Sequence, residues 1–307
     1  MLALLVAITV GAIIPIQSAA NTRLRLSVGD KPLVSALISF SLALAVSIVA
    51  TTALQGNPIP DLAAASGAGW WVWLGGVMGV CFIVGNILLF PRIGAVQTMV
   101  LPILGQLVMG LLVDRFGLFG APVHEVGPGR LLGALVVLSG IALVLNLGRN
   151  HSPDREQAAG PEVWAWRAVG VAIGMGSATQ TTVNGVLGTM VGSSLHAAEV
   201  NLFIGAALLL LIALLTSPRQ LVRRPSPGPW WMWLGGVVGA TFVIAGATLA
   251  PILGTATTVI GLNAGTILGG QVMESVGAFG ARKRPLDARR VAGLVLVFVG
   301  VLMVRLL

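Results

Sequence analysis

The stretch Trp-Trp-Val-Trp-Leu-Gly-Gly-Val-Met-Gly at residues 70–79 decides the fold, because it returns as Trp-Trp-Met-Trp-Leu-Gly-Gly-Val-Val-Gly at residues 230–239. A long internal copy indicates a duplicated architecture before any single element is assigned. The likeness extends from this stretch in both directions. It includes Gly11, Gln17, Asn21, Pro91, Gly94 and Asp114, whose counterparts are Gly174, Gln180, Asn184, Pro251, Gly254 and Glu274.

The composition around this repeat points to a membrane protein. Of the 307 residues, 56% are hydrophobic and only 9% are charged, and the mean hydropathy is +0.96. Soluble domains carry about 25% charged residues, so lipid must cover much of this surface. This composition excludes most soluble enzymes. The net charge is +8, and the charged residues lie between the apolar runs. The positive charge therefore indicates how the chain is oriented in the membrane rather than a nucleic-acid partner.

Apolar runs long enough to cross a bilayer come in a series of ten; nine are free of charge, and the tenth carries Arg289, Arg290 and Arg305 near its ends, where long side chains can reach the membrane interface. They cover residues 2–22, 33–54, 70–91, 93–113, 131–148, 168–195, 200–218, two spans within 225–273 that meet near Pro251 and Gly254, and 288–306. We therefore expect an all-α membrane protein with ten transmembrane helices. The predicted first five-helix repeat is 1–148, the polar linker is 149–161 and the second repeat is 162–307.

Five is an odd number, so a second copy must enter the membrane upside down, as in many secondary transporters. With the N-terminus outside, fifteen of the 18 Lys and Arg residues fall on the inner side. The positive-inside rule then places both termini outside. No Lys or Arg precedes Arg23, so we expect residues 2–22 to be a retained span rather than a cleaved signal peptide.

Two pairs of amides are the first candidates for a substrate-binding site. Gln17 and Asn21 are four residues apart, on one face of the first span, and Gln180 and Asn184 repeat the arrangement in the sixth. Polar side chains in a bilayer face a cavity or another helix. We expect these amides to bind substrate near the middle of the membrane. The alternative is that they only hydrogen-bond neighbouring helices.

Glu199 is the candidate for proton coupling, because it is an acid in only one half: its repeat counterpart is Ala36. It follows His196 by three residues, so the alternative is an interfacial pair of these two side chains. Asp114 and Glu274 both precede a Gly-x-Phe-Gly turn. We interpret these two acids as capping or loop-pairing residues.

The remaining candidates are aromatic or amide side chains whose surroundings the sequence does not fix. Trp73 and Trp233 lie in the repeated Trp triplets and can stack on a substrate, or anchor the protein at the membrane interface. Embedded amides that can face a cavity include Gln97, Gln106 and Asn263.

Ten spans arranged as five plus five resemble the drug/metabolite transporter superfamily. Gln-x-x-x-Asn in the first span, the Trp-Trp-rich start of the third followed by Gly-Gly, Ile-Gly-Ala-Val-Gln-Thr at 93–98 and Asp114 before a Phe-Gly turn resemble its YdcZ-like branch. That branch often occurs as single five-span proteins, and this chain resembles two such units fused. The resemblance implies a transporter in the bacterial inner membrane. Related small multidrug-resistance proteins depend on a Glu in the first span, where this chain has Gln17 and Gln180.

The sequence therefore predicts a secondary transporter of a small molecule or metabolite, acting in export by alternating access through a central cavity between the repeats. The alternative is a membrane scaffold or lipid-interacting subunit without transport activity. Motifs for phosphate, dinucleotide or HExxH zinc chemistry are absent from the sequence, so we expect no enzyme activity, no cofactor and no metal. The expected partners are the small-molecule substrate and the lipid bilayer, with a monomer as the working unit and a homodimer left open.

Overall fold

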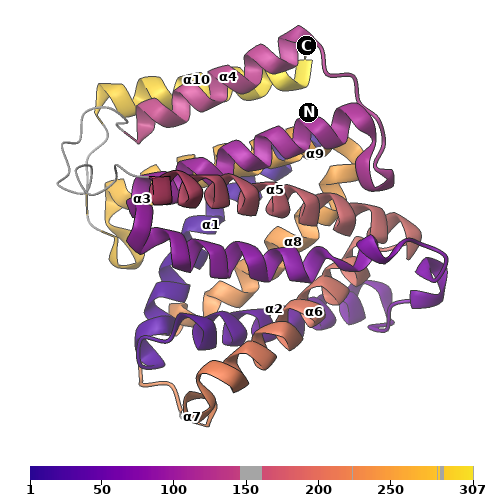
Figure 1. Ribbon diagram of the computed structural model, residues 1–307, viewed down its shortest axis with the longest axis vertical. Coiled ribbons are helices and arrows are strands. Elements are labelled where there is room, and N and C mark those ends of the chain that lie inside the picture. Colours follow the sequence, from indigo (N-terminus) through magenta and orange to yellow (C-terminus); the bar gives the residue numbers. More distant parts are fainter. Residues whose placement is uncertain (146–160, 223, 282, 284–286, 307) are drawn as a thin grey trace.

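The computed structural model describes residues 1–145, 161–222, 224–281, 283 and 287–306, and the regular elements in these ranges are all helical (Figure 1). The α-helices are α1 (Leu2–Ser27), α2 (Pro32–Gln55), α3 (Gly75–Phe116), α4 (Pro128–Val144), α5 (Pro161–Met190), α6 (Ser194–Thr216), α7 (Pro218–Leu221), α8 (Leu234–Leu253), α9 (Thr255–Val276) and α10 (Ala288–Leu306). Short 3₁₀ helices are η1 (Leu62–Ala65), η2 (Trp70–Trp73), η3 (Leu118–Gly120), η5 (Trp230–Trp233) and η6 (Ala278–Gly280).

Within the described ranges, six helical segments are long and apolar enough to cross a membrane. They are Leu2–Ser27, Pro32–Gln55, Gly75–Gly94, Gln97–Phe116, Ser194–Thr216 and Trp230–Leu253. Helices α4, α5, α9 and α10 lie where the sequence predicts the other four spans. The predicted linker lies outside the described residues, apart from Pro161, which begins α5.

Two glycines break long helices at matching positions. Gly94 lies inside α3 with φ 75° and ψ 167°, and Gly254 separates α8 from α9 with φ 83° and ψ 158°. Residues with a Cβ rarely adopt this conformation. In each case a threonine four residues later donates a 2.8 Å hydrogen bond to the glycine carbonyl: Thr98 to Gly94 and Thr258 to Gly254. The predicted turn near Pro251 and Gly254 is confirmed, and α3 is two helical segments joined at Gly94.

The tryptophan triplets form short 3₁₀ turns rather than the first turn of the α-helices that follow them. η2 and η5 are 3₁₀ helices, and the α-helices follow at Gly75 and Leu234. The predicted start of the third span at residue 70 is therefore too early. A 3₁₀ turn is a common entry to an α-helix, and the sequence pattern does not distinguish the two.

Close helix contacts through glycine hold α1 and α5 against the opposite half of the chain. A Cβ on Gly11 of α1 would collide with the backbone of Leu262 in α9, and one on Gly174 of α5 would collide with the backbone of Pro102 in α3. Small residues allow such backbone approach in membrane helices. The first helix of each half therefore packs on the broken helices of the other.

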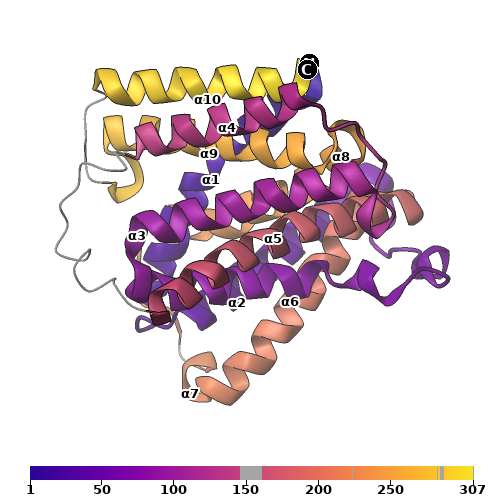
Figure 2. The ribbon, with the colours of Figure 1, turned by 45° about the horizontal axis from the view of Figure 1, so that its top comes forward.

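Helices α4 and α10 pack together at one edge of the bundle (Figure 2). Their contact also relies on glycine, because a Cβ on Gly140 would lie 2.7 Å from the Gly293 carbonyl oxygen. At the other side of the bundle α2 packs against α6. This arrangement leaves α1, α3, α5, α8 and α9 at the centre.

Candidate functional site

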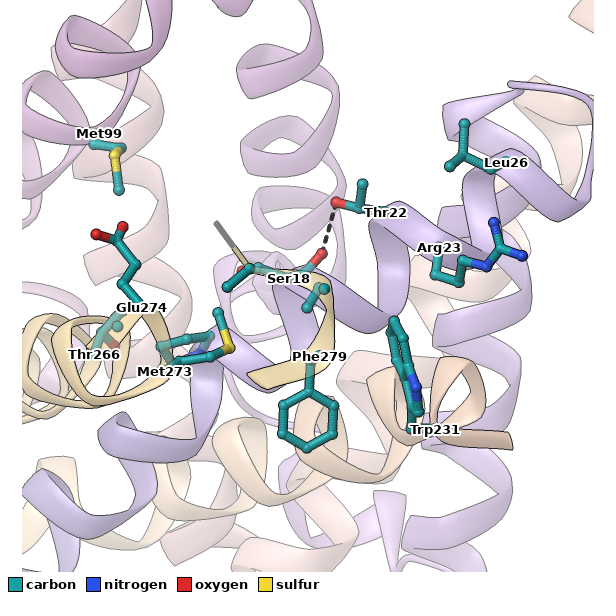
Figure 3. A pocket seen from close by; sticks show the side chains of 15 residues that line it. Ser18, Thr22, Arg23, Leu26, Met99, Trp231, Thr266, Met273, Glu274 and Phe279 are labelled. Atoms are coloured by element: carbon teal, nitrogen blue, oxygen red, sulfur yellow. Dashed lines mark hydrogen bonds between the residues drawn. The ribbon is translucent and has the colours of Figure 1, made fainter. Parts of the chain in front are cut away.

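A cavity of about 670 Å³ opens beside the C-terminal part of α1 (Figure 3). Ligand pockets typically measure about 300–1,000 Å³, so this one can hold a small molecule. Its lining comes from α1, the second segment of α3, η5, α9 and η6. The residues are Pro15, Ser18, Ala19, Thr22, Arg23, Leu26, Met99, Trp231, Thr266, Gly270, Met273, Glu274, Phe279, Gly280 and Ala281.

The walls of the cavity combine apolar and polar groups. The Trp231 and Phe279 rings contact each other edge to face, with centroids 5.6 Å apart. Glu274 is balanced by Arg290, whose Nη1 lies 3.2 Å from the Glu274 carboxylate and also donates to Gln271 at 3.2 Å. Arg23 adds a second cationic group. The cavity therefore suits an amphipathic molecule.

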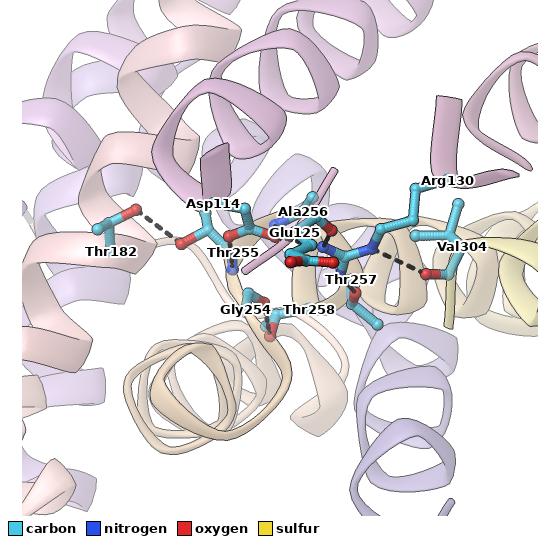
Figure 4. A network of polar contacts seen from close by, with 10 residues as sticks. All are labelled: Asp114, Glu125, Arg130, Thr182, Gly254, Thr255, Ala256, Thr257, Thr258 and Val304. Carbon is cyan, nitrogen blue, oxygen red and sulfur yellow. Dashed lines mark hydrogen bonds and ion pairs between the residues drawn. The ribbon is translucent and has the colours of Figure 1, made fainter. Parts of the chain in front are cut away.

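Asp114 binds the N-terminus of α9 (Figure 4), whereas the cavity is lined by the C-terminal part of the same helix. Its carboxylate accepts hydrogen bonds from the backbone N–H of Thr255 at 2.6 Å and of Ala256 at 3.2 Å. Arg130 Nη1 is 3.8 Å from the same carboxylate. Of the two roles expected for Asp114, capping or loop pairing, the structure shows capping. The helix it caps is 141 residues further along the chain.

Arg130 joins several elements around Asp114. It donates to the Val304 carbonyl of α10 at 3.1 Å, to the Thr257 hydroxyl of α9 at 2.9 Å and to the Glu125 carbonyl at 2.9 Å. Nearby, the hydroxyls of Thr182 in α5 and Thr255 lie 3.0 Å apart. We call this region the Asp114 end and the region of the cavity the Glu274 end.

The amides of α1 pack against α2 and α8. Asn21 Oδ1 accepts a 2.5 Å hydrogen bond from Ser39, and it lies where a Cβ on Gly235 would be. Gln17 Nε2 is 2.9 Å from the position of a Cβ on Gly239. Both glycines belong to the repeated Gly-Gly-x-x-Gly run.

The amides of α5 have matching neighbours. Gln180 and Asn184 donate to Asn201 Oδ1 of α6 at 3.2 and 3.1 Å. They lie against Gly79 and Gly75 of α3, as Gln17 and Asn21 lie against α8. The four amides form two clusters at helix contacts, and none of them lines the cavity described above. Their predicted role in substrate binding stays a prediction.

Two other predicted amides meet at the centre of the bundle. Asn263 of α9 donates to Gln106 Oε1 of α3 at 2.7 Å, and Gln106 Nε2 donates to the Ser177 hydroxyl of α5 at 3.0 Å. Gln97 lies apart from them and accepts a 2.8 Å hydrogen bond from Arg167. Gln106 and Asn263 thus connect three central helices.

Glu199 is buried between α6 and α2, with 5% of the residue exposed. It lies near Thr51 and His196, and its Oε1 has no hydrogen-bond partner among the described residues. The His196 ring pairs instead with the Asn57 carbonyl at 3.0 Å. Within the described residues, the ion-pair interactions do not join Glu199 to His196. The interfacial pair considered above is therefore not formed.

The predicted tryptophans do not line the cavity. Trp73 packs against Ala65, Leu187 and Ala197, and Trp233 is 41% exposed. Trp231, the central residue of the second triplet, reaches the cavity instead. Five residues of the lining were not predicted from the sequence as site residues: Trp231, Ser18, Thr22, Arg23 and Met99. The spacing of Ser18 and Thr22 by one helical turn was the available signal for this face.

Comparison with known proteins gives matches in both halves of the chain. The sequence model of the family described as "Putative inner membrane exporter, YdcZ" matches residues 2–143 and again residues 165–303. The chain is also 31% identical to "Inner membrane protein YdcZ" of Escherichia coli (strain K12) over 75 residues, which are 24% of this chain and 50% of that protein. The match thus spans half the length of this relative.

A protein of known crystal structure shares the fold. It superposes with a TM-score of 0.68 at 17% identity, over 98% of this chain and 94% of its own. At that identity the likeness concerns the fold alone. The two family matches cover most of the chain, and apolar helices provide several membrane spans. The chain therefore belongs to the YdcZ family of inner-membrane proteins, as a multi-pass membrane protein that matches the family model in two segments.

Proposed function

We propose that this protein is a secondary transporter that exports a small molecule by alternating access between two inverted five-helix repeats, residues 1–148 and 162–307. In this proposal α3 contributes two spans and the other long helices one each, for ten in all. Family membership supports transport. The main support for alternating access is the difference between the two ends of the bundle. The Glu274 end holds a cavity, and the opposite, Asp114 end is packed.

The proposed topology places the cavity on the cytoplasmic side. With both termini outside, Arg23 and the loop after Phe279 lie inside, while Asp114 and Thr255 lie outside. The positive charges of residues 23–31 and 282–290 support this orientation. An exporter loads its substrate from the cytoplasm, so this conformation is the one that receives it.

The proposed substrate is an amphipathic small molecule. Trp231, Phe279 and Met273 offer an apolar surface, and Ser18 and Thr22 offer hydroxyl groups. The central network of Gln106 and Asn263 provides further amides for a later stage of the path. The roles of Gln17, Asn21, Gln180, Asn184, Gln97, Trp73 and Trp233 in binding, and of Glu199 in proton coupling, belong to the same proposal.

Transport can be tested with proteoliposomes loaded with a defined mixture of labelled amino acids, nucleosides, sugars and aromatic acids. We expect release of at least one solute by the wild-type protein under a proton gradient. Ser18→Trp should block that release because the indole fills the cavity. Leu5→Trp is the matched control on the exposed surface of the same helix. If the wild-type protein releases no solute in either of its orientations in the liposome membrane, the result would contradict transport and favour the membrane scaffold.

Proton coupling adds one variant to this assay. Glu199→Gln keeps the shape of the side chain and removes its charge. We expect downhill release to continue, while acceleration by the proton gradient is lost. Glu162→Gln, on the exposed first turn of α5, should retain that acceleration. Unchanged acceleration in Glu199→Gln would exclude Glu199 as the coupling residue.

A further inference from the structure

The Asp114 end and the Glu274 end are built from matching residues but differ in packing. Asp114 and Glu274 are counterparts in the sequence repeat, yet the Asp114 side chain is 1% exposed and the Glu274 side chain 36%. Met99 and Val259 are also counterparts, and they are 55% and 5% exposed. The two ends therefore stand in opposite states.

The same contrast holds along α1 and α5. Ser18 and Thr22 line the cavity. Their counterparts Thr181 and Gly185 are buried against α8, where a Cβ on Gly185 would lie 3.0 Å from the Pro251 ring. One end is closed by the contact between α5 and α8, and the equivalent stretch of α1 faces open space.

The glycine breaks show what closes the packed end. A Cβ on Gly254 would lie 2.7 Å from the Asp114 carboxylate, whereas a Cβ on Gly94 would meet nothing within 4 Å. Both glycines have the same backbone conformation and the same threonine hydrogen bond. The second segment of α3 thus begins with the same local structure as α9, but with no carboxylate against its glycine.

We propose that Asp114 and Glu274 are alternating latches. In the conformation described here the Asp114 carboxylate holds the N-terminus of α9 and closes its end. In the opposite conformation Glu274 moves to the N-terminus that follows Gly94 and closes the cavity, while Asp114 releases α9. This inference rests on the proposed two-repeat transporter and names the residues that switch it.

The chemistry of the two groups suits this role. The N-terminus of a helix carries partial positive charge and free N–H groups, which bind a carboxylate strongly in a medium of low dielectric. Arg130 and Arg290 lie 3.8 and 3.2 Å from the two carboxylates. Each arginine can therefore hold its carboxylate when that latch is released, so that no charge is left alone in the membrane.

Cysteine cross-linking can report the closure of each end separately. Cys81 is the only cysteine, so Cys81→Ser gives a cysteine-free background. Thr181→Cys with Gly246→Cys reports the closed Asp114 end, because a Cβ on Gly246 lies 3.5 Å from the Thr181 methyl carbon. That separation is close to the range a disulfide needs. The repeat counterparts, Ser18→Cys with Asn86→Cys, report closure of the Glu274 end.

We expect Asp114→Asn to lower the cross-linking rate of the first pair relative to the second by about tenfold, which corresponds to about 1.4 kcal/mol. Glu274→Gln should act oppositely and slow the second pair. Asp61→Asn, an exposed cap of η1, is the matched control and should change neither rate. Ratios within twofold of the control for both variants would overturn the proposal.

Two further outcomes are separable. If Asp114→Asn does not fold, Glu274→Gln at its half-exposed position decides the question alone, and an unchanged rate for the second pair overturns the latch. Cross-linking is measured without substrate. If both substitutions change the cross-linking rates but the wild-type protein moves no solute, the result would therefore support the latches and contradict transport. If the wild-type protein releases solute but neither substitution changes the cross-linking rates, the result would contradict only the latches.

Discussion

At the scale of single residues, the contacts between amides and glycines are the most regular feature of the molecule. Asn21 and Asn184 each occupy the space that a methyl group would take at Gly235 and Gly75. The sequence shows both motifs and their duplication. It does not show that each amide meets the glycine run of the other half, because that pairing depends on the arrangement of the helices in space.

Gly235→Ala should destabilise the protein, because its methyl group would overlap Asn21 Oδ1 and separate α1 from α8. Overpacking of this kind costs about 1–3 kcal/mol. Thermal unfolding in detergent, followed by the intrinsic tryptophan fluorescence, measures the loss. Gly67→Ala is the control, since a Cβ there meets nothing within 4 Å. Equal melting temperatures for the two variants would contradict the packing described.

At the scale of elements, the sequence predicted the helices better than their ends. Charge-free runs located the membrane segments because a bilayer excludes charge. The tryptophan triplets were predicted to begin the membrane helices, although they form 3₁₀ turns before the α-helices start. The cap on α9 was not predictable in detail, because its carboxylate comes from α3 and no local pattern connects the two.

The pair of α4 and α10 gives a test at this scale. Gly140→Val should weaken the pair, because even a Cβ at this position would lie 2.7 Å from Val297 N. We expect a loss of about 2 kcal/mol or more in stability. Ser139→Val, on the exposed neighbouring position, should have little effect. Size-exclusion chromatography after a heating series compares the two variants. Equal survival would show that the pair is not held by close backbone contact.

At the scale of the whole molecule, the sequence predicted the duplication. It did not predict the difference in packing between the Asp114 end and the Glu274 end. The residues that follow Asp114 and Glu274 in the sequence are similar, because the two acids are counterparts in the repeat. Only the structure shows one of them buried at a helix N-terminus and the other in a cavity. In the proposed mechanism this asymmetry belongs to one conformation, whereas a sequence encodes all the conformations of a protein together.

The proposed orientation gives a prediction for the C-terminal end of these 307 residues. Alkaline phosphatase fused after Leu307 should be active, and green fluorescent protein at the same site should stay dark, because the positive charges place this end outside. The same two reporters inserted between residues 149 and 160 should give the reverse pattern. Bright fluorescence from the C-terminal fusion would contradict the orientation and reverse the assignment of the cavity to the cytoplasm.

The packing of α1 on α8 and α9 has a consequence for biosynthesis. α1 ends at Ser27 and α8 begins at Leu234. At roughly 5–20 residues per second, the ribosome needs on the order of ten seconds or more to deliver the helices that cover Gln17 and Asn21. During that interval newly made α1 exposes Gln17 and the rest of the face that packs on α8 and α9, although Ser39 of α2 can already bind Asn21. Its retention by an insertase or a temporary neighbour would then set how efficiently the protein assembles.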